Sequence, residues 1–299
     1  MIKKASIIDT HAHLDFKEFD RDREETIKRF FKSGGKKIIN VGCDLKSSAR
    51  SVALAEKYEN IFASVGVHPH DADTFDAGAL KKLEELTASQ KAVAIGEIGL
   101  DYFRPESSGS PKEKQIEAFK LQLDLAENHK KPVIIHCRDA YVELIEILKN
   151  YQPKADEPRA HKTPILQGVV HCFLGSWPIA EKVLKLGFYI GFTGAITYAK
   201  EAKTVDVTIA SKIKLDELDE PLDFARGEPE IFKVIKNMPI DRILIETDCP
   251  YLAPALHRGE RNEPSYIKYV AEKIAEIKGI SVGEVEKATS ENARKLFGI

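Results

Sequence analysis

The sequence predicts a (β/α)8 barrel, and three observations support this fold class. Eight short apolar runs rich in Ile and Val recur along the 299 residues, each followed by a polar turn and then an amphipathic stretch. The runs are almost continuously apolar rather than alternating, as is typical of parallel strands buried on both faces. The length suits one large α/β domain, and there is no internal repeat or low-complexity segment. We therefore expect residues 1–299 to form a single domain.

Each predicted strand is one of these apolar runs. In order, the runs are ASIID (5–9), KIINVG (37–42), IFASVGV (61–67), AVAIGEIG (92–99), PVIIHC (132–137), GVVHCF (168–173), GFYIGFTG (187–194) and RILIETD (242–248). Between them, apolar residues recur at the spacing of one helix face, as over 113–129. The tail predicts two more helices, at about 264–278 and 281–297.

Two segments interrupt this rhythm. The stretch YQPKADEPRAHKTP (151–164) is rich in proline and charge and precedes a strand, so we expect a solvated insertion on the N-terminal face of the barrel. The stretch at about 199–227 follows the seventh strand and opens on the C-terminal face, where the active sites of such barrels lie. A loop of this length is either a lid that contacts substrate or a disordered tether.

The composition excludes several classes of protein. No apolar run approaches the length of a membrane span, and the N-terminus lacks the apolar core of a signal peptide, so we expect a cytoplasmic protein without a membrane partner. The formal net charge of −2 argues against nucleic-acid binding over the whole surface, so any phosphate binding must be local. The four cysteines are scattered without a CxxC pair, which disfavours a zinc finger or disulfides and favours small, buried, reduced side chains.

Histidines and acidic residues gather at the predicted strand ends. Glu97 and Asp248 end the fourth and eighth strands within otherwise apolar runs. Six of the nine histidines lie at or just past strand ends, namely His11, His13, His68, His70, His136 and His171. One histidine at a strand end is usually a hydrogen-bonded structural residue, whereas a buried carboxylate without a partner is costly. The joint pattern therefore indicates a functional site.

A barrel gathers all eight strand ends around one mouth. The residues that we expect to be neighbours there are His11, His13, Glu97, His136, His171 and Asp248. Four imidazoles and two carboxylates suit Zn²⁺, Mn²⁺ or a similar divalent ion. Six ligands are too many for one catalytic zinc with an open position, but they fit two ions bridged by a carboxylate.

Seven short motifs extend from the first predicted strand to the tail. They are DTHAHLD, VGVHPHD, GEIGLDYFR, IIHCRDA, VVHCF, ILIETDCPYLAP and RGERNEP. In order and spacing, they resemble the motifs of the TatD-like metal-dependent deoxyribonucleases of the amidohydrolase superfamily. The resemblance runs from about residue 5 to the closing TSENARKLFGI and departs at the two insertions. Its most specific parts are ETDCPYLAP and Glu97, which stands where many relatives of the superfamily carry a metal-bridging lysine.

The resemblance implies two bound divalent ions, Zn²⁺, Mn²⁺ or Mg²⁺. His11, His13, Glu97 and Asp248 would hold one ion, and Glu97, His136 and His171 the other. His68 would contact substrate rather than metal. The implied activity is hydrolysis of DNA phosphodiester bonds, as an exonuclease acting on single-stranded or 3′ ends. A divalent ion lowers the pKa of bound water from 15.7 towards ~7, and we expect Asp248 to be the general base, with Glu97 as the second catalytic residue.

Cations and aromatic rings are expected around the same mouth. Arg138 and Arg261 are the expected phosphate contacts, with Arg104 and Arg258 on the same side. Tyr102, Phe103 or Trp177 either stacks a base of a single-stranded end or has only a structural role. Asp101 is expected at the substrate or as a partner that orients a metal ligand.

Two other functions fit parts of the pattern. A related hydrolase of the superfamily, acting on a lactone, an amide, a phosphotriester or the ester of an aminoacyl-tRNA, would use the same metals. It would cleave small neutral esters with weak salt dependence, whereas DNA cleavage weakens steeply as salt rises. A barrel kept only for binding or scaffolding predicts loss of metal ligands, and all six are present.

Overall fold

The computed structural model describes residues 7–103, 109–151, 166–198 and 229–299. Arg104 and the predicted insertion at 199–227 lie outside these ranges, as does all but the first residue of the one at 151–164. No helix formed by the described residues has the length and apolar character needed to cross a membrane.

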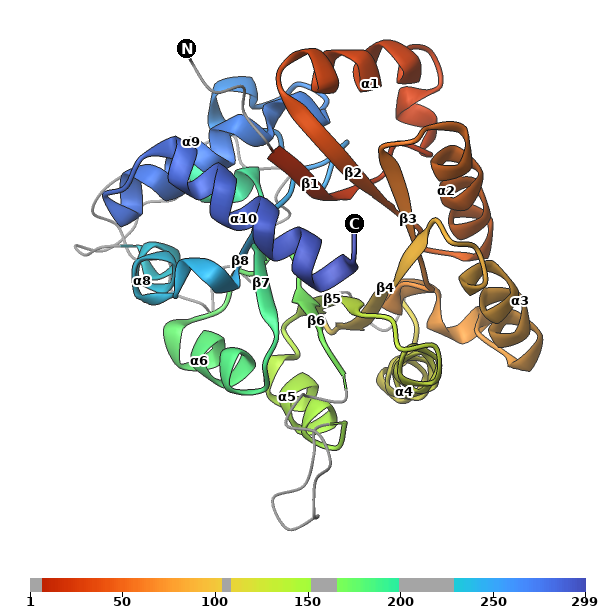
Figure 1. Ribbon diagram of the computed structural model, residues 1–299. Coiled ribbons are helices and arrows are strands. Elements are labelled where there is room, and N and C mark those ends of the chain that lie inside the picture. Colours follow the sequence, from red (N-terminus) through yellow and green to blue (C-terminus); the bar gives the residue numbers. More distant parts are fainter. Residues whose placement is uncertain (1–6, 104–108, 152–165, 199–228) are drawn as a thin grey trace.

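Eight parallel strands form one sheet in sequential order, which confirms the predicted (β/α)8 barrel (Figure 1). The strands are β1 (Ile7–Ala12), β2 (Gly35–Val41), β3 (Ile61–Val65), β4 (Ala92–Asp101), β5 (Val133–Arg138), β6 (Gly168–Val170), β7 (Tyr189–Phe192) and β8 (Ile243–Ile245). The sheet closes where the chain beyond β8 pairs with the end of β1. Ala12 and Cys249 form a parallel bridge, and the amide of Asp248 donates to the carbonyl of His11 at 2.8 Å.

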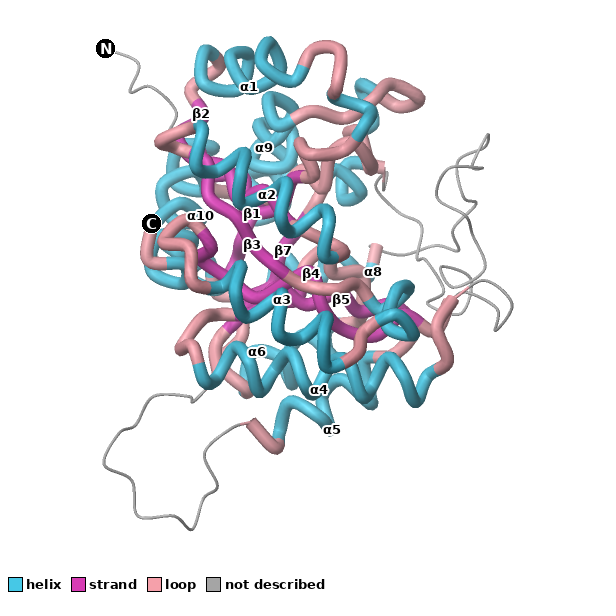
Figure 2. The backbone as a smooth tube through the Cα atoms, turned by 90° about the vertical axis from the view of Figure 1, so that its right-hand side faces the viewer, coloured by secondary structure: helices cyan, strands magenta, loops and turns pink. Residues whose placement is uncertain are grey.

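In the described part of the chain, the helices surround the outside of the sheet, except for the last helix, which lies across one end of it. They are α1 (Arg23–Lys32), α2 (Leu45–Lys57), α3 (Ala77–Thr87), α4 (Lys112–Asn128), α5 (Tyr141–Lys149), α6 (Trp177–Lys185), α8 (Glu230–Asn237), α9 (Ile267–Lys278) and α10 (Val282–Phe297). α10 crosses one end of the barrel instead of packing on its side (Figures 1 and 2). It begins with a capping box between Ser281 and Glu284, which satisfies free amides of its first turn.

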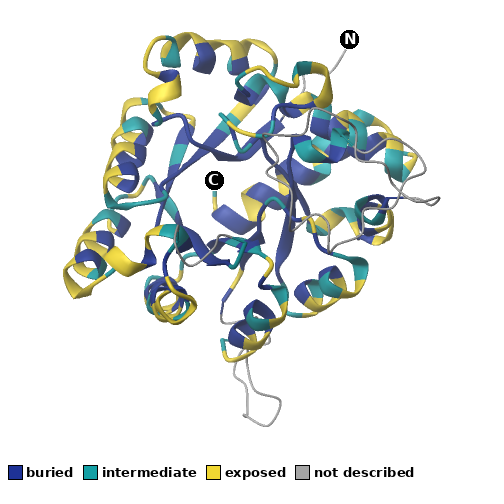
Figure 3. Cartoon of the chain, turned by 180° about the vertical axis from the view of Figure 1, so that it is seen from behind, coloured by how far each residue is buried: buried dark blue, intermediate teal, exposed yellow. Residues whose placement is uncertain are grey.

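The hydrophobic core has two parts, and Figure 3 shows that the strands and the inner faces of the helices are buried. The larger part lies between strands and surrounding helices. The smaller part fills the barrel interior with side chains such as Ile8 and Leu244, and Ala293, Leu296 and Phe297 of α10 complete it. α10 therefore closes the N-terminal end of the barrel, and the C-terminal end remains for the chemistry.

Several predicted strand ends differ from the structure. Strands β6 and β8 end at Val170 and Ile245, earlier than predicted, and beyond them Cys172 and Asp248 interrupt the regular strand conformation with positive φ angles of 44° and 56°. Strand β4 instead continues to Asp101, which pairs with Arg138 of β5. Glu97 therefore lies inside a strand rather than at its end.

All four cysteines are free, as the sequence predicted. Cys137 and Cys249 are buried as predicted, but the prediction of burial is wrong for Cys43 and Cys172, which are partly exposed.

Candidate metal centre

A bulge in β1 aims His11 and His13 into the mouth of the barrel. Asp9 pairs with Ile38 and Ala12 with Asn40, so three steps on β1 oppose two on β2. The two Nε2 atoms lie 3.1 Å apart. Nδ1 of His13 lies 2.8 Å from the carbonyl oxygen of Val41, which assigns its proton to Nδ1 and leaves Nε2 as a lone-pair donor.

A second bulge, in β4, turns Glu97 inward. Ile95 pairs with Val133 and Ile98 with Ile135, so the chain again carries one extra residue. The flanking glycines permit this. A Cβ on Gly96 would lie 2.7 Å from Cβ of Ile134, and a Cβ on Gly99, at φ +142°, would lie 2.0 Å from the carbonyl oxygen of His136. The GEIG motif thus serves the close approach of β4 and β5.

The Oε1 atom of Glu97 faces three histidines, which lie in β5, directly after β6 and in the segment after β3. It lies 2.8 Å from Nε2 of His171 and 3.0 Å from Nδ1 of His136. Nε2 of His68 is 3.5 Å away. One carboxylate oxygen is therefore shared by three imidazoles.

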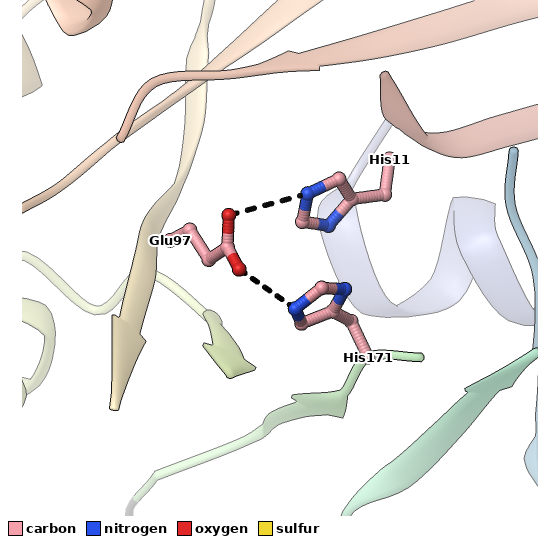
Figure 4. A group of neighbouring side chains, drawn as sticks. All are labelled: His11, Glu97 and His171. Carbon is pink, nitrogen blue, oxygen red and sulfur yellow. Dashed lines mark ion pairs between the residues drawn. The ribbon is translucent and has the colours of Figure 1, made fainter. Parts of the chain in front are cut away.

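The Oε2 atom of the same carboxylate faces the histidines of β1. It lies 3.5 Å from Nε2 of His11 and 3.7 Å from Nε2 of His13. Figure 4 shows the Glu97 carboxylate between His11 and His171, whose rings stack at 4.1 Å. The two oxygens of Glu97 thus face two different sets of ring nitrogens.

Asp248 lies beside His11 and His13 and completes the set that faces Oε2 of Glu97, which is called the first set below. Its Oδ1 lies 3.4 Å from Nε2 of His13 and 3.6 Å from Nε2 of His11. Its side chain is 14% exposed, against 6% for Glu97, so it lies nearer to solvent.

The charge state of the carboxylates follows from these contacts. Burial would raise the pKa of Glu97, but the charges of His171 and His68 and hydrogen bonds from the other histidines lower it well below its usual range. The same competition, with His13 as the main hydrogen-bond partner, lowers the pKa of Asp248. Both groups are carboxylates at neutral pH.

The surroundings of each histidine decide whether its pKa is lowered or raised. Burial lowers the pKa of His11, and it lowers that of His68 even further. Burial also acts on His171, but the charge of Glu97 and a contact with Glu246 raise its pKa well above 6.5. Two buried ring nitrogens, Nδ1 of His11 and Nδ1 of His171, have no hydrogen-bond partner among the described residues.

The donor set fits divalent ions. Three groups have ligand atoms that all lie within 4.8 Å of one another: His11, Glu97 and His171; His11, His13 and Asp248; and His68, Glu97 and His136. Imidazole and carboxylate are ligands of zinc and manganese. Since Glu97 belongs to two of these groups, the arrangement can hold more than one ion.

Asp101 lies behind the ring of His136. This position corresponds to one of its two expected roles, that of a partner that orients a metal ligand. Its Oδ2 lies 3.0 Å from Nε2 of His136 and 2.8 Å from Nε2 of His70. Burial acts against these contacts, but the two histidines lower the pKa of Asp101. Asp101 is therefore an acceptor that holds both rings.

The structure does not bring every expected residue to this cluster. Arg261 forms two hydrogen bonds to Asp22, of 2.6 and 2.8 Å, and one to the carbonyl oxygen of Glu18. Because Asp22 already neutralises the guanidinium, this placement favours a structural role over phosphate contact. The guanidinium of Arg138 stacks on Phe103, 3.5 Å from the ring centroid.

The remaining aromatic and basic candidates pack elsewhere. The hydroxyl of Tyr102 donates to Glu143 at 2.5 Å. Trp177 begins α6, where its amide donates to Glu230, and Arg258 stacks on Tyr198 at 5.5 Å. These contacts favour the structural alternative for Tyr102 and Trp177.

Sequence reasoning missed two fully buried acids beneath the cluster, Asp9 and Glu246. Oδ2 of Asp9 accepts from the hydroxyl of Thr247 at 2.6 Å, and burial raises the pKa of Asp9 to about 7. Oε1 of Glu246 accepts from the amide of Cys172 at 2.6 Å and lies 3.6 Å from Nδ1 of His171. The sequence contained a signal for both residues, namely an acidic residue within an apolar run. The same signal had identified Glu97.

A barrel whose C-terminal mouth holds four histidines and two carboxylates around shared oxygens defines a metal-dependent hydrolase class. Comparison with known proteins gives the family. The family model described as TatD related DNase matches residues 8–219 and 222–298. The chain therefore belongs to the TatD family of metal-dependent hydrolases.

Individual relatives cover almost the whole chain. An uncharacterized metal-dependent hydrolase, YabD of Bacillus subtilis, is 40% identical and covers 98% of this chain and 99% of its own length. The 3′-5′ ssDNA/RNA exonuclease TatD of Erwinia tasmaniensis is 32% identical, with 98% and 100% covered. Among solved structures, the TatD homologue YJJV of Escherichia coli is 31% identical, with a TM-score of 0.79 and 98% of each chain covered.

Proposed function

We propose that this TatD-family hydrolase cleaves phosphodiester bonds of DNA as an exonuclease acting on single-stranded or 3′ ends. The observation that supports it most is that the two oxygens of Glu97 face two sets of imidazoles. Such a carboxylate suits a pair of divalent ions, and paired ions are typical of enzymes that cleave phosphodiesters. Relatives named 3′-5′ ssDNA/RNA exonucleases support the substrate class.

The proposed ligand sets follow the two faces of Glu97. His11, His13, Glu97 and Asp248 hold the first ion, and Glu97, His136 and His171 hold the second. When bound, such ions supply hydroxide at neutral pH and neutralise the charge that develops on the phosphate oxygens.

Asp248 is the proposed general base. It is ionised at neutral pH and is the more exposed of the two ligand carboxylates, so it can accept a proton from the attacking water. The water oxygen forms a bond to phosphorus, and the phosphorus–oxygen ester bond breaks. Asp248 then passes the proton to the departing sugar oxygen, so that it ends the cycle as a carboxylate.

His68 and Arg138 are the proposed substrate contacts. His68 faces the same oxygen of Glu97 as the second ligand set, and its lowered pKa keeps the ring neutral. A neutral imidazole can hydrogen-bond to a phosphate ester oxygen. Arg138 follows His136 by two residues on β5, so the two side chains leave the strand on the same side, and its guanidinium, now stacked on Phe103, is the proposed cation for a phosphate oxygen.

The test is nuclease activity of the purified protein after EDTA treatment and reconstitution with Mg²⁺, Mn²⁺ or Zn²⁺. The substrates are 5′-labelled and 3′-labelled single-stranded oligonucleotides, duplexes and circular single-stranded DNA. We expect metal-dependent release of nucleotides from linear strands, steeply reduced by salt, and no cleavage of circles. Hydrolysis of lactones or carboxylic esters without cleavage of any oligonucleotide would contradict the proposal and favour the other superfamily activities.

A further inference from the structure

The exposed large apolar side chains of the described residues all lie at the catalytic end of the barrel. They are Val142, Leu174, Tyr251 and Leu256, which are 73, 40, 51 and 77% exposed. They follow strands β5, β6 and β8, so each projects from a segment at the C-terminal mouth. An exposed aromatic ring beside a proposed active site can stack on a nucleobase.

Tyr251 is the aromatic member of this set and lies next to the first ligand set. It follows Asp248 by three residues, and its amide donates to the carbonyl of Asp248 at 3.0 Å. The centroids of the Tyr251 and Phe16 rings lie 6.3 Å apart, and the angle of 77° between the ring planes makes this an edge-to-face contact. Phe16 in turn stacks on His13 at 4.7 Å. Two aromatic rings thus continue outward from a proposed metal ligand.

The backbone under Tyr251 is held rigidly. The side-chain amide of Asn262, which is 1% exposed, donates to the carbonyl of Tyr251 at 2.6 Å and to that of Thr247 at 2.8 Å. The amide of Asn262 also donates to the carbonyl of Pro250 at 3.1 Å. A backbone fixed in this way limits the positions that the Tyr251 ring can take, so less conformational freedom is lost when a ligand stacks on it.

The charges nearby favour an uncharged ligand at this position. Asp248, three residues before Tyr251, carries a carboxylate. A nearby carboxylate repels a phosphate group, whereas a nucleobase presents an uncharged aromatic face.

We propose that Tyr251, backed by Phe16, is the stacking platform for the nucleobase next to the scissile phosphodiester. The inference rests on the proposed nuclease function and makes it more specific: the substrate is a strand whose terminal bases are unpaired, because a paired base has no free face. The platform replaces two residues that the sequence had suggested for this role: Tyr102, whose hydroxyl donates to Glu143, and Trp177, which is partly buried against the hydrophobic core.

The test compares Tyr251 variants on two labelled oligothymidylates with the metal-loaded protein. One oligonucleotide is complete, and the other lacks the bases of the two nucleotides at the cleaved end. Tyr251→Ala and Tyr251→Leu should lower kcat/KM on the complete strand about 10- to 100-fold, since base–aromatic stacking is worth about 1–3 kcal/mol. Tyr251→Trp should stay within about threefold of the wild type, because it keeps an aromatic face.

On the strand without terminal bases, all variants and the wild type should have the same kcat/KM. Metal content, measured for each variant, should be unchanged. The matched control is Tyr151→Ala, which removes a tyrosine whose hydroxyl bonds Asp124 beyond the C-terminal end of α5, and it should cleave both strands like the wild type.

Three outcomes overturn the inference in distinguishable ways. If the wild type cleaves the complete strand and Tyr251→Ala cleaves it equally well, stacking by Tyr251 is wrong and the nuclease function stands. If the wild type cleaves no oligonucleotide with any metal, the nuclease function fails and the platform with it. A loss in Tyr251→Ala that is equal on both strands would also reject stacking and indicate a general effect on the site.

Discussion

Nε2 of His136 lies 3.0 Å from Oδ2 of Asp101, while Nδ1 of the same ring lies 3.0 Å from Oε1 of Glu97. The imidazole is thus held between two buried carboxylates. Metal-binding histidines commonly use their second nitrogen to bond a carboxylate, which sets the orientation of the ring and its tautomer. We therefore propose that Asp101 is a positioning residue for a ligand, a role that can be separated from a contact with substrate.

The first prediction concerns Asp101→Asn. The amide can no longer act as an anionic acceptor for His136, so metal affinity should fall about 10- to 100-fold while the protein stays folded. Isothermal titration of the metal-free protein with Mn²⁺ or Zn²⁺ measures this. Asp241→Asn, at an exposed aspartate before β8 at the other end of the barrel, is the matched control. Unchanged affinity in Asp101→Asn would rule out the positioning role.

The second prediction concerns Asp248→Asn. Loss of the proposed base should reduce turnover of an oligonucleotide by a factor of about 10²–10⁴. The circular dichroism spectrum should not change, because the amide of residue 248 still donates to His11 and keeps the barrel closed. The measurement is single-turnover cleavage with metal content determined in parallel. A metal-loaded variant with near-normal rates would refute the role.

The third prediction is proton release on metal binding. In the metal-free protein the pKa of His171 lies well above 6.5, so its ring carries a proton at pH 7. A metal ligand must be the neutral imidazole, and the pKa values of the proposed ligands His13 and His136 are raised as well, so binding at pH 7 should release at least one proton per chain and affinity should fall as pH falls. An indicator dye in weak buffer measures the release when Zn²⁺ is added. Binding without any release at pH 7 would show that His171 is not a ligand or is already neutral.

The fourth prediction separates a structural from a substrate role for Arg261. Its hydrogen bonds lower the pKa of Asp22 below the usual 3.8, so this pair stabilises the fold above that pH and loses its effect as the pH falls below it. Arg261→Ala should cost about 1 kcal/mol of unfolding free energy at pH 7, because solvent screens the partly exposed pair, and less at pH 3.5. Urea unfolding at the two pH values measures both differences. The KM for an oligonucleotide should change less than about twofold. A tenfold rise in KM would instead support a contact between Arg261 and a phosphate group of the substrate.

The fifth prediction concerns the closed end of the barrel. Leu296 of α10 is 6% exposed and packs in the barrel interior, far from the mouth. Leu296→Ala should lower the free energy of unfolding by about 2–5 kcal/mol, as is usual for a cavity in a core. Metal affinity per folded molecule should stay the same. A large loss of affinity without loss of stability would contradict the separation of the two ends.

The sequence predicted the barrel because parallel strands buried on both faces leave a continuous apolar signature, and it predicted the cluster because barrel topology brings strand ends together. It could not locate Glu97 correctly within β4. The bulge there depends on the close packing of Gly96 and Gly99 against β5, which no local pattern records.

Residue types, their order along the chain and their attachment to strands are local properties, and the sequence by itself determined them: the fold class, the histidines and carboxylates of the mouth, and the free cysteines. The tertiary structure alone decided which side chains share partners. It paired Arg261 with Asp22, set Asp101 behind His136 and brought Tyr251 against Phe16, each between segments distant in sequence. Such pairs form only when the closed barrel fixes the distances between its loops, and that information resides in the packing of the whole chain.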